Sequence, residues 1–410
     1  MYMKLCTINV VNDTGSTGRI AAALCRAVDR AGGESLFLYG RGGAPGDIAS
    51  HRVGTDRTMY VHAALSRLTG RQGFYARRET ERAVSVLASF DPDVIHLHNV
   101  HGYYLHIPTL FSYLRECGKP VVWTLHDCWA FTGRCAYFDM AHCDRWETGC
   151  GACVRMDAYP KSWLLDSSAK SFVEKRALFS ALPDLTLVTP SEWLKRLLAR
   201  SFLSDKRVLV MPNGIDLGVF RPTQSDLIEQ YGLKGRKVLL GATNIWEPRK
   251  GLPFFFKLRE ALDASYAIVL IGLTEKQRRE LPDGILGLAR TADIRTLAAW
   301  YTAADVFVDC TLEDTFPTTH IEALACGTPV VTFAAGGSAE MLDERCGAGV
   351  PVGDIEGMCA AIPRALTMES GACIARARQY DAGERLAAYL PVYEACMRAA
   401  RGAGTEEGVK

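Results

Sequence analysis

Short runs of β-branched and aliphatic residues alternate with helical patterns along the chain, and this alternation constrains the fold more than any other feature. In the first half, five runs are typical of buried strands: Lys4–Val10, Ser35–Tyr39, Val94–His98, Val121–Leu125 and Leu185–Thr189. Between them, residues 18–31 and 82–90 carry apolar positions at the 3.6-residue period of a helix. Strands that alternate with helices build βαβ units, so we predict an α/β fold with parallel sheets covered by helices.

The second half of the chain repeats the same pattern. Its expected strands are Val208–Met211, Val238–Ala242, Ala267–Ile271, Val306–Asp309 and Val330–Phe333, with helices at Asp293–Ala303, Thr318–Ala325 and Ala375–Ala400. A chain of 410 residues is too long for one ordinary core. A stretch rich in proline and glycine, from Leu203 to Thr223, marks the boundary between the two halves of the chain. We predict an N-terminal domain over residues 1–205, a second domain over 206–385, and a C-terminal helix and tail over 386–410 that packs back on the first.

Composition narrows the classes of function. The net charge of +1 gives no electrostatic case for nucleic acid as a partner. The N-terminus, Met1 to Cys6, leads directly into a strand-like run without the apolar region of a signal peptide. No segment has the roughly 18 to 20 apolar residues that span a bilayer. We therefore expect a cytoplasmic globular protein.

The stretch from Leu312 to Val330 carries the strongest functional signal. It places Asp314 on a turn and Glu322, eight positions later, inside a helix that ends before Gly327. A turn that opens into a helix gathers backbone N–H groups, which attract phosphate. Carboxylates beside it can accept hydrogen bonds from sugar hydroxyls. The alternative is that both are solvated charges near a helix start, where negative groups are favoured.

Two cations follow an earlier strand of the same half. The segment Trp246 to Gly251 comes after the strand Val238–Ala242 and contains Arg249 and Lys250. In open α/β sheets, ligands bind beyond the carboxyl ends of strands. Arginine binds phosphate as a fork and lysine as a point charge, so the pair could neutralise a diphosphate. Taken alone, the loop would be a solvated basic turn.

Polar residues also end two strands of the first half. His96, His98 and Asn99 close one strand, and His126 and Asp127 close the next. Alternation places His96 and His98 on one face, a spacing that metal hydrolases also use. We expect His96 to be a core residue and His98 to line a cleft. A metal-dependent hydrolase built on His96, His98 and Asp127 is retained as an alternative.

Five cysteines lie within residues 128–153, in a segment with little periodicity. The spacing of Cys150 and Cys153 is that of a zinc knuckle, and Cys135 and Cys143 could complete a four-thiolate site. An irregular insertion of about residues 128–155 needs something to order it, and a structural zinc ion would do so. Packed thiols or a pair of disulfides are the alternatives.

These motifs resemble those of glycosyltransferase family 4, a family with the GT-B fold of two facing Rossmann-like domains. The most specific segments are residues 210–216, 249–251 and 313–330, and the family's pair of acidic residues falls on Asp314 and Glu322. The resemblance implies that Asp314 holds donor-sugar hydroxyls and Glu322 the ribose hydroxyls. Backbone N–H groups of Thr318 and Thr319, with Arg249 and Lys250, would contact the diphosphate. Pro317 departs from the family's usual glycine, and Asn244 or Ile245 stands where an arginine is usual.

The resemblance assigns roles in the first half as well. It implies that His126 reaches the donor sugar, that the loop with Gly15 and Gly18 and the segment with Asn213 lie on the donor side, and that His98 and Asn99 line the acceptor side. We thus expect a retaining, metal-independent glycosyltransferase of surface-polysaccharide biosynthesis. Its donor would be a UDP- or GDP-sugar and its acceptor a saccharide or lipid-linked saccharide, with peripheral contact to the inner face of the membrane. A nucleotide-sugar epimerase of the same architecture is the main alternative.

Overall fold

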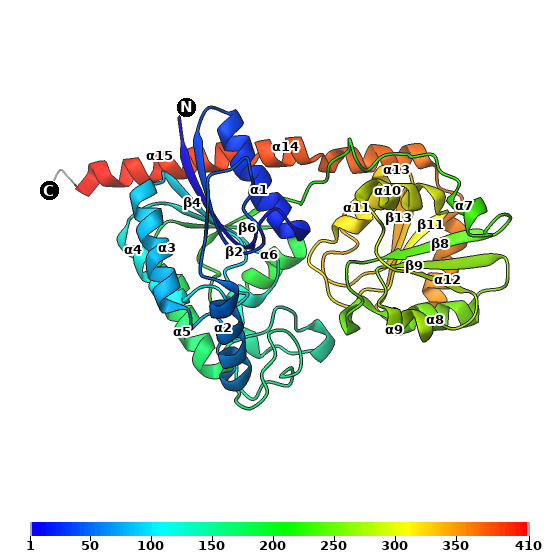
Figure 1. The fold of residues 1–410 in the computed structure, drawn as a ribbon, viewed down its shortest axis with the longest axis horizontal. Coiled ribbons are helices and arrows are strands. Elements are labelled where there is room, and N and C mark those ends of the chain that lie inside the picture. The colour runs from blue at the N-terminus through cyan, green and yellow to red at the C-terminus, as the bar shows by residue number, and fades with distance from the viewer. Residues whose placement is uncertain (1, 408–410) are drawn as a thin grey trace. The chain divides into compact units, whose positions relative to one another are not determined.

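The structure, a computed structural model, describes residues 2–407 and divides into two compact units (Figure 1). Unit 1 comprises Met1–Met211 together with Arg385–Lys410, and unit 2 comprises Pro212–Glu384. The C-terminal segment thus belongs to the same unit as the N-terminus. Each unit contains its own sheet and its own apolar cores.

Unit 1 is built on a seven-stranded sheet in which all paired strands are parallel. The strands are β1 (Lys4–Val11), β2 (Glu34–Arg41), β3 (Ser50–Arg52), β4 (Val94–Leu97), β5 (Val121–Thr124), β6 (Leu185–Thr189) and β7 (Arg207–Val210), in the order β3-β2-β1-β4-β5-β6-β7. We had expected the last of these, as Val208–Met211, to belong to the second half. That expectation is wrong, because β7 pairs with β6 through Leu187 and Val208.

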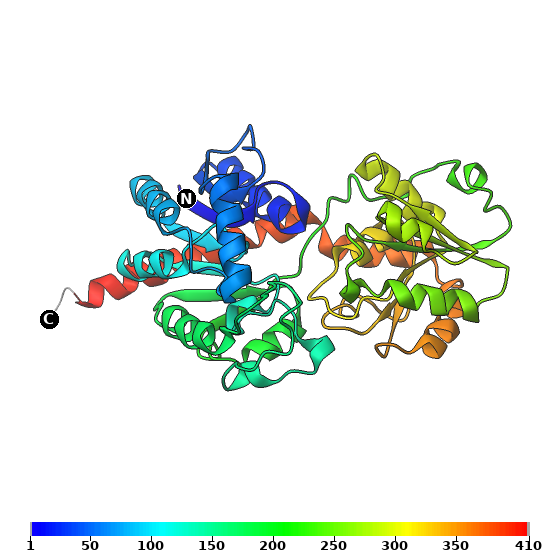
Figure 2. The same ribbon diagram turned by 60° about the horizontal axis from the view of Figure 1, so that its bottom comes forward.

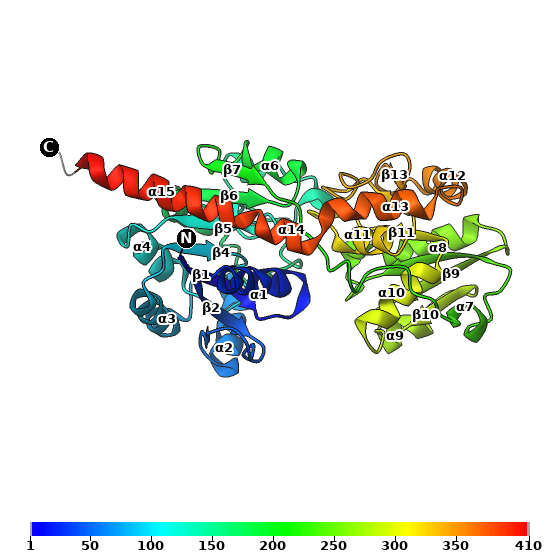
Figure 3. The same ribbon diagram turned by 90° about the horizontal axis from the view of Figure 1, so that it is seen from above.

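Helices cover both faces of this sheet. On one face, α1 (Gly15–Arg30) and α15 (Tyr389–Glu407) enclose a core in which Tyr393 is fully buried among Leu5, Val94 and Val122. On the other, α3 (Arg77–Phe90), α4 (Ile107–Glu116), α5 (Ser168–Ser180) and α6 (Glu192–Leu198) complete the largest apolar cluster. Helix α2 (Asp56–Thr69) lies on the side of the unit that faces the viewer in Figure 2. Figure 3 shows α15 crossing the strands of the sheet.

Unit 2 has a six-stranded parallel sheet. Its strands are β8 (Lys237–Ala242), β9 (Tyr266–Ile271), β10 (Ile285–Leu288), β11 (Val306–Asp309), β12 (Val330–Phe333) and β13 (Gly347–Val350), in the order β10-β9-β8-β11-β12-β13. One face carries α7 (Leu227–Gln230), α10 (Ile294–Ala303), α11 (Thr318–Ala325) and α13 (Ser370–Ala377). The other carries α8 (Leu252–Ala261), α9 (Glu275–Arg279) and α12 (Ile355–Ala365) (Figure 1).

In both sheets the strand order reverses once, between β1 and β4 in unit 1 and between β8 and β11 in unit 2. The loops that leave the carboxyl ends of such a strand pair diverge to opposite sides of the sheet and leave a crevice, where open α/β sheets bind ligands. The loop that follows β8 carries Arg249 and Lys250, and the loop that follows β11 carries Asp314. The topology therefore brings the two sequence signals of unit 2 together.

The expected single helix over Ala375–Ala400 is not formed. After α13 the chain makes a 3-10 turn at Arg378–Tyr380, then α14 (Ala382–Ala387), and only then α15. Asp381 interrupts the helix because its carboxylate accepts a hydrogen bond from the backbone N–H of Glu384 (3.1 Å). The end of the predicted polar tail, residues 408–410, lies outside the described residues. Nowhere in residues 2–407 is there a helix of the length and apolarity that crossing a membrane requires.

Candidate active site

The basic loop of unit 2 is fixed against the loop that follows β11. Arg249 and Lys250 end a 3-10 turn, Pro248–Lys250, that is closed by Gly251 in the left-handed conformation (φ 68°). A Cβ atom on Gly251 would lie 2.0 Å from the carbonyl oxygen of Cys310, so only glycine permits this approach. The backbone N–H of Leu312 donates to the carbonyl of Arg249 (2.8 Å). The two loops therefore form one rigid unit.

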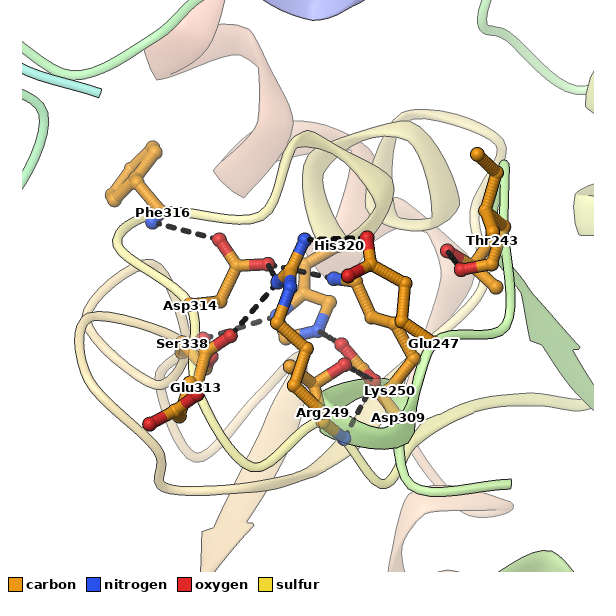
Figure 4. A network of polar contacts seen from close by, with 12 residues as sticks. Thr243, Glu247, Arg249, Lys250, Asp309, Glu313, Asp314, Phe316, His320 and Ser338 are labelled. Atoms are coloured by element: carbon orange, nitrogen blue, oxygen red, sulfur yellow. Dashed lines mark hydrogen bonds and ion pairs between the residues drawn. The ribbon is translucent and has the colours of Figure 1, made fainter. Parts of the chain in front are cut away.

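Asp314 lies at the centre of a cationic network, drawn in Figure 4. Its Oδ2 atom is 2.7 Å from Lys250 Nζ and 3.5 Å from Arg249 Nη1, and Arg249 Nη1 also donates to the carbonyl of Glu313 (3.0 Å). Burial alone would raise the pKa of Asp314, but the charges of Lys250 and Arg249 hold it below its usual range. Two cations thus converge on one carboxylate, and Glu247, 3.7 Å from Arg249 Nη2, adds a second negative charge, so ion pairs hold both cations in place.

Helix α11 points its N-terminus into this loop cluster. Pro317 occupies the N-cap position with extended backbone (φ −71°), and no side chain caps the helix. Thr318 and Thr319, both half-buried, form its first turn, whose N–H groups have no partner within the helix. Proline replaces the family's usual glycine without strain here, because this position needs a φ near −65° and no N–H donor. The backbone donors expected for phosphate are thereby preserved.

Two further residues of this cluster were not recognised from the sequence. His320, fully buried on α11, shares a hydrogen bond with Asp309 at the end of β11 (Nε2 to Oδ2, 2.8 Å) and with the carbonyl of Ser338 (Nδ1, 3.0 Å) (Figure 4). Burial raises the pKa of Asp309, but the hydrogen bond and charge of His320 lower it well below its usual range overall. The pair connects β11, α11 and the loop after β12. The only sequence signal was an aspartate at a strand end and a histidine in the first turn of a helix.

The second carboxylate of the motif has a different environment. Glu322 is 6% exposed and accepts a hydrogen bond from the hydroxyl of Tyr301 on α10 (3.0 Å). Burial and the neighbouring Glu322 carboxylate raise the pKa of Tyr301 well above its usual value, so the phenol remains a donor. Glu322 is therefore oriented by a fixed hydrogen bond, whereas Asp314 is held by ion pairs.

A glycine pair closes the cluster from the loop after β12. A Cβ atom on Gly336 (φ 61°) would lie 1.9 Å from the carbonyl oxygen of Asp314, and the N–H of Gly337 donates to the same oxygen (3.2 Å). The glycines thus let this loop pack on the backbone of Asp314 and fix its position.

In unit 1, three histidines stack at the ends of β4 and β5. His96 is fully buried, with its ring nitrogens within 2.7 Å of the Tyr393 hydroxyl and 2.8 Å of the Thr124 hydroxyl. The His96 and His98 ring centroids are 4.2 Å apart, and His98 Nδ1 is 3.0 Å from His126 Nε2. Burial lowers the pKa of His126 to about 4 and that of His96 to about 3, so both are neutral at pH 7. The stack can therefore relay hydrogen bonds but carries no charge.

A second group of polar side chains lies beside this stack. Asp127 Oδ2 is 2.9 Å from His101 Nε2, and His101 Nδ1 is 2.8 Å from the hydroxyl of Tyr159, which also accepts from Gln72 (2.9 Å). His101 belongs to no motif of its own, and Tyr159 lies too far along the chain for a motif to connect the two residues. The hydrolase alternative is not supported, because Asp127 pairs with His101 and not with His96 or His98.

The remaining predicted positions are placed as follows. Gly15 (φ 65°) starts α1, and a Cβ atom on Gly18 would lie 3.2 Å from the backbone nitrogen of Asp13, so both glycines shape the turn after β1. The backbone N–H of Asn99, which follows β4, donates to the side chain of Asn9 (3.2 Å). Asn213 is half-buried in the segment after β7, and in residues 2–407 it forms no hydrogen bond with the loops around Asp314.

The cysteine-rich segment runs irregularly from the end of β5 to α5, and buried cations hold it. Lys175 is fully buried; its Nζ donates to the carbonyl of Thr132 (2.7 Å) and lies 3.5 Å from the ring centroid of Trp129. Burial lowers the pKa of Lys175 to about 7. Arg134, 3% exposed, donates to the carbonyl of Arg155 (2.8 Å). These contacts attach the segment to α5 and connect Arg134 with Arg155 inside it.

The four thiols proposed for zinc lie in this segment but do not form a ligand set. Cys150 Sγ accepts a hydrogen bond from the backbone of Gly133 (3.1 Å), and Cys153 Sγ lies 3.9 Å from Arg134 Nη1. A hydrogen bond from Cys135 lowers the pKa of Cys153 to about 6. Within the described part of the chain, no three His, Cys, Asp or Glu side chains are arranged to hold a metal ion.

Comparison with known protein families agrees with this arrangement. Residues 17–219 match the family model described as Glycosyltransferase Family 4, and residues 236–368 match the model described as Glycosyl transferases group 1. The two matches fall on the two sheets. Fold and site thus define a glycosyltransferase with the GT-B fold. More narrowly, the chain belongs to glycosyltransferase family 4.

Two relatives extend over most of the chain. A putative colanic acid biosynthesis glycosyl transferase of Escherichia coli strain K12 is 27% identical over 360 residues, covering 84% of this chain and 86% of the relative. A GDP-mannose-dependent alpha-mannosyltransferase of Mycolicibacterium smegmatis is 28% identical over 314 residues, covering 74% of this chain and 71% of the relative.

Solved structures show the same fold. A sucrose-phosphate synthase from Thermosynechococcus elongatus superposes with a TM-score of 0.71 at 16% identity, over 97% of this chain and 100% of that one. The Anabaena protein Alr3699/HepE in complex with UDP and glucose superposes with a TM-score of 0.67 at 15% identity, over 96% of this chain and 100% of that one.

Proposed function

We propose that the protein transfers a sugar from a nucleoside-diphosphate sugar to a hydroxyl of a saccharide or lipid-linked saccharide during polysaccharide assembly. One observation carries the proposal: Arg249, Lys250 and the uncapped N-terminus of α11 converge at the topological switch point of unit 2. The Anabaena neighbour was solved in complex with UDP, and a relative depends on GDP-mannose, so both nucleotides are candidates. The acceptor fits the polysaccharide product of the Escherichia coli relative.

The charges of the cluster suggest how the leaving group is stabilised. Asp314 neutralises part of the charge of Lys250 and Arg249, and Glu247 neutralises part of the charge of Arg249. An incoming diphosphate would compete for these cations, and the carboxylate of Asp314 would then be available to accept hydrogen bonds from the sugar. Cations and helix N–H groups fixed in advance stabilise the charge that develops on the diphosphate as the glycosidic bond breaks. These groups can do so without a divalent metal ion, and we propose a metal-independent reaction that retains the anomeric configuration.

Unit 1 would supply the acceptor side of this reaction. His126, His98 and Asn99 follow the strands β4 and β5 beside the switch point of their sheet, where an α/β fold binds ligands. A neutral His126 can exchange a hydrogen bond with a sugar hydroxyl, since its pKa of about 4 leaves one ring nitrogen as donor and the other as acceptor at pH 7. An acceptor that is lipid-linked would also bring the enzyme to a membrane surface.

Substitution of Glu322 tests the donor site. Glu322→Gln keeps an oxygen for the hydroxyl of Tyr301 but removes the charge that would bind ribose. A lost charged hydrogen bond costs about 1.5–3 kcal/mol, so we expect the dissociation constant of the nucleotide to rise roughly 10- to 150-fold. Titration calorimetry with UDP, GDP and their sugars measures this.

Tyr301→Phe is the matched control, because it removes the hydrogen bond to Glu322 and leaves the carboxylate in place. It should weaken donor binding far less than Glu322→Gln. Equal losses in the two variants would mean that Glu322 acts only through the packing of α10 on α11. Unchanged affinity in Glu322→Gln, or no binding of any nucleotide by the wild type, would contradict the donor site.

We also propose a structural zinc ion in the cysteine-rich segment, although the thiols would have to draw together around it. Burial, and to a smaller extent the charges of Cys143 and Cys153, raise the pKa of Cys150, so these groups are near one another. Elemental analysis should find about one zinc ion per chain, the number that one tetrahedral site holds. The zinc should be lost in Cys150→Ser and kept in Cys359→Ser, a thiol of unit 2. Metal-free protein of full stability and activity would remove this proposal.

A further inference from the structure

Helix α2 of unit 1 turns an apolar face to solvent. Tyr60 is 69% exposed, Val61 59%, Leu65 37% and Leu68 40%. These positions lie on one side of the helix, whereas His62, Ala63 and Ser66 on the other side are buried. An ordinary surface helix has the opposite pattern, with its large apolar residues against the core. The exposed face therefore needs an explanation beyond folding.

A second exposed apolar segment lies directly against this helix. Trp163 is 62% exposed, Leu164 70% and Leu165 57%. The segment is anchored at the end of α2: the backbone N–H of Trp163 donates to the carbonyl of Arg67 (2.6 Å), and a Cβ atom on Gly70 would lie 2.5 Å from the carbonyl oxygen of Leu165. The Arg67 guanidinium lies 5.5 Å from the Trp163 ring centroid. We call the joint surface the apolar platform, formed by Tyr60, Val61, Leu65, Leu68, Trp163, Leu164 and Leu165.

Unpaired cations border the apolar platform. Arg57, Lys161 and Lys170 are exposed, and none of the three forms an ion pair within residues 2–407. Among the anions nearby, Asp56 pairs with Arg52 and Glu174 pairs with Arg71, whereas Asp166 accepts from the uncharged backbone N–H groups of Cys153 (2.7 Å) and Ser168 (2.9 Å) and keeps its charge. The three cations outnumber the charge of Asp166, so the balance of these groups is positive.

An apolar surface with aromatic residues and a basic border fits one kind of partner. Apolar side chains of this kind enter the boundary between headgroups and acyl chains, and lysine and arginine bind anionic headgroups. A symmetric dimer through the platform is disfavoured, because each surface would meet its own copy and bring Arg57, Lys161 and Lys170 near their equivalents. The charges therefore favour an anionic lipid bilayer over a second copy of the chain.

The platform is also connected to the His101–Asp127 pair, which lies beside His126. On the inner side of α2, His62 accepts a hydrogen bond from the backbone of Gly73 (3.2 Å), and its ring packs edge-on against Tyr103 (5.9 Å between centroids). Tyr103 packs against Tyr159 (6.3 Å), whose hydroxyl is bonded to His101. Helix α2 is thus connected to the His101–Asp127 pair through His62, Tyr103 and Tyr159.

We propose that the apolar platform docks unit 1 on an anionic phospholipid bilayer, so that a lipid-linked acceptor is held beside His101 and Asp127. The docking site rests on the proposed function only for the identity of the acceptor. Lipid binding itself depends on unit 1 alone. It can therefore be measured without donor or acceptor.

Vesicle cosedimentation of the full-length protein tests the docking site. The wild type should bind phosphatidylcholine vesicles that contain phosphatidylglycerol more tightly than pure phosphatidylcholine vesicles, and added salt should reduce the difference.

The double substitution Leu164→Glu and Leu165→Glu, at solvent-exposed positions, should weaken binding at least about tenfold. Lys161→Ala and Lys170→Ala should each weaken binding to the anionic vesicles about fivefold and leave neutral vesicles unaffected. Val352→Glu, at a 52% exposed position of unit 2, is the matched control and should bind as the wild type does.

Two further measurements separate this inference from the proposed function. Calorimetric titration with nucleotide should give the same affinity in the Leu164→Glu, Leu165→Glu variant as in the wild type, since donor binding belongs to unit 2. Failure of nucleotide binding with intact vesicle binding would contradict only the proposed function. Docking is overturned if the wild type binds neither kind of vesicle, or if the double variant binds as well as the wild type. A wild-type dimer in sedimentation velocity that the double variant abolishes would likewise overturn it, and would assign the platform to self-association.

Discussion

Replacement of Lys250 by alanine is expected to lower kcat/KM roughly 10- to 150-fold, because one charged hydrogen bond to the leaving diphosphate is worth about 1.5–3 kcal/mol. Lys250 lies 2.7 Å from Asp314, so the substitution also leaves that carboxylate with Arg249 alone, at 3.5 Å. If the lysine stabilises the charge that develops on the leaving group, kcat should fall more than the affinity for the donor. Steady-state kinetics with the donor found by titration measure both.

Lys276→Ala provides the matched control for this substitution. Lys276 lies on α9 of the same unit, is 85% exposed in its side chain, and is 3.8 Å from Glu280. An exposed ion pair of this kind contributes little, so its kinetics should match those of the wild type. If Lys250→Ala also retains wild-type kcat and KM, the cluster around Asp314 is a structural ion-pair network and not a phosphate site.

The strands of this fold could be predicted because each is a buried run of apolar residues between turn residues. β4, β5 and β6 are buried over their full length, and their limits follow from the sequence to within a residue. The assignment of β7 to a sheet failed for a physical reason. Its pairing with β6 is decided by the length of the connection through α6, and no local pattern carries that information.

The meeting of the loops after β8 and β11 was also predictable from the sequence, because their residues are contiguous and their elements are regular. Arg249, Lys250 and Asp314 were recognised from two short segments, and the strand order β8–β11 brings these segments together. The pairing of His320 with Asp309 was not predicted. Each of these two residues is unremarkable in its own segment, and only the packing of α11 on the sheet reveals the hydrogen bond.

Contacts in unit 1 that depend on irregular backbone were the least predictable. Tyr159 reaches His101 from a segment without secondary structure, and Lys175 reaches the same segment from α5. A buried lysine on a helix gives no sequence signal that distinguishes it from an exposed one. The cysteines are more conspicuous in the sequence than these cations, although the cations and the aromatic side chains around Trp129 also hold the segment.

Asp309→Asn is expected to destabilise unit 2 by roughly 1.5–3 kcal/mol at pH 7, because it removes the charge from a hydrogen bond to the fully buried His320. The pKa of Asp309 is depressed in the folded protein, so the stabilisation that it provides is complete above its unfolded pKa of about 3.9. The stabilisation is lost as the pH falls through the folded pKa. Thermal unfolding should therefore show a lower Tm for the variant at pH 7, and the difference from the wild type should shrink in strong acid.

Glu275→Gln is the control for this effect, since it removes an equally charged but exposed partner. Glu275 is 70% exposed in its side chain and lies 2.8 Å from Arg278, and such a pair contributes about 0–1 kcal/mol. Its Tm should stay near that of the wild type at every pH. A Tm for Asp309→Asn that equals the wild type at pH 7 would show that the hydrogen bond to His320 does not depend on the carboxylate charge. In that case the connection between β11 and α11 would rest on packing alone, and the positions of Thr318 and Thr319 would be insensitive to it.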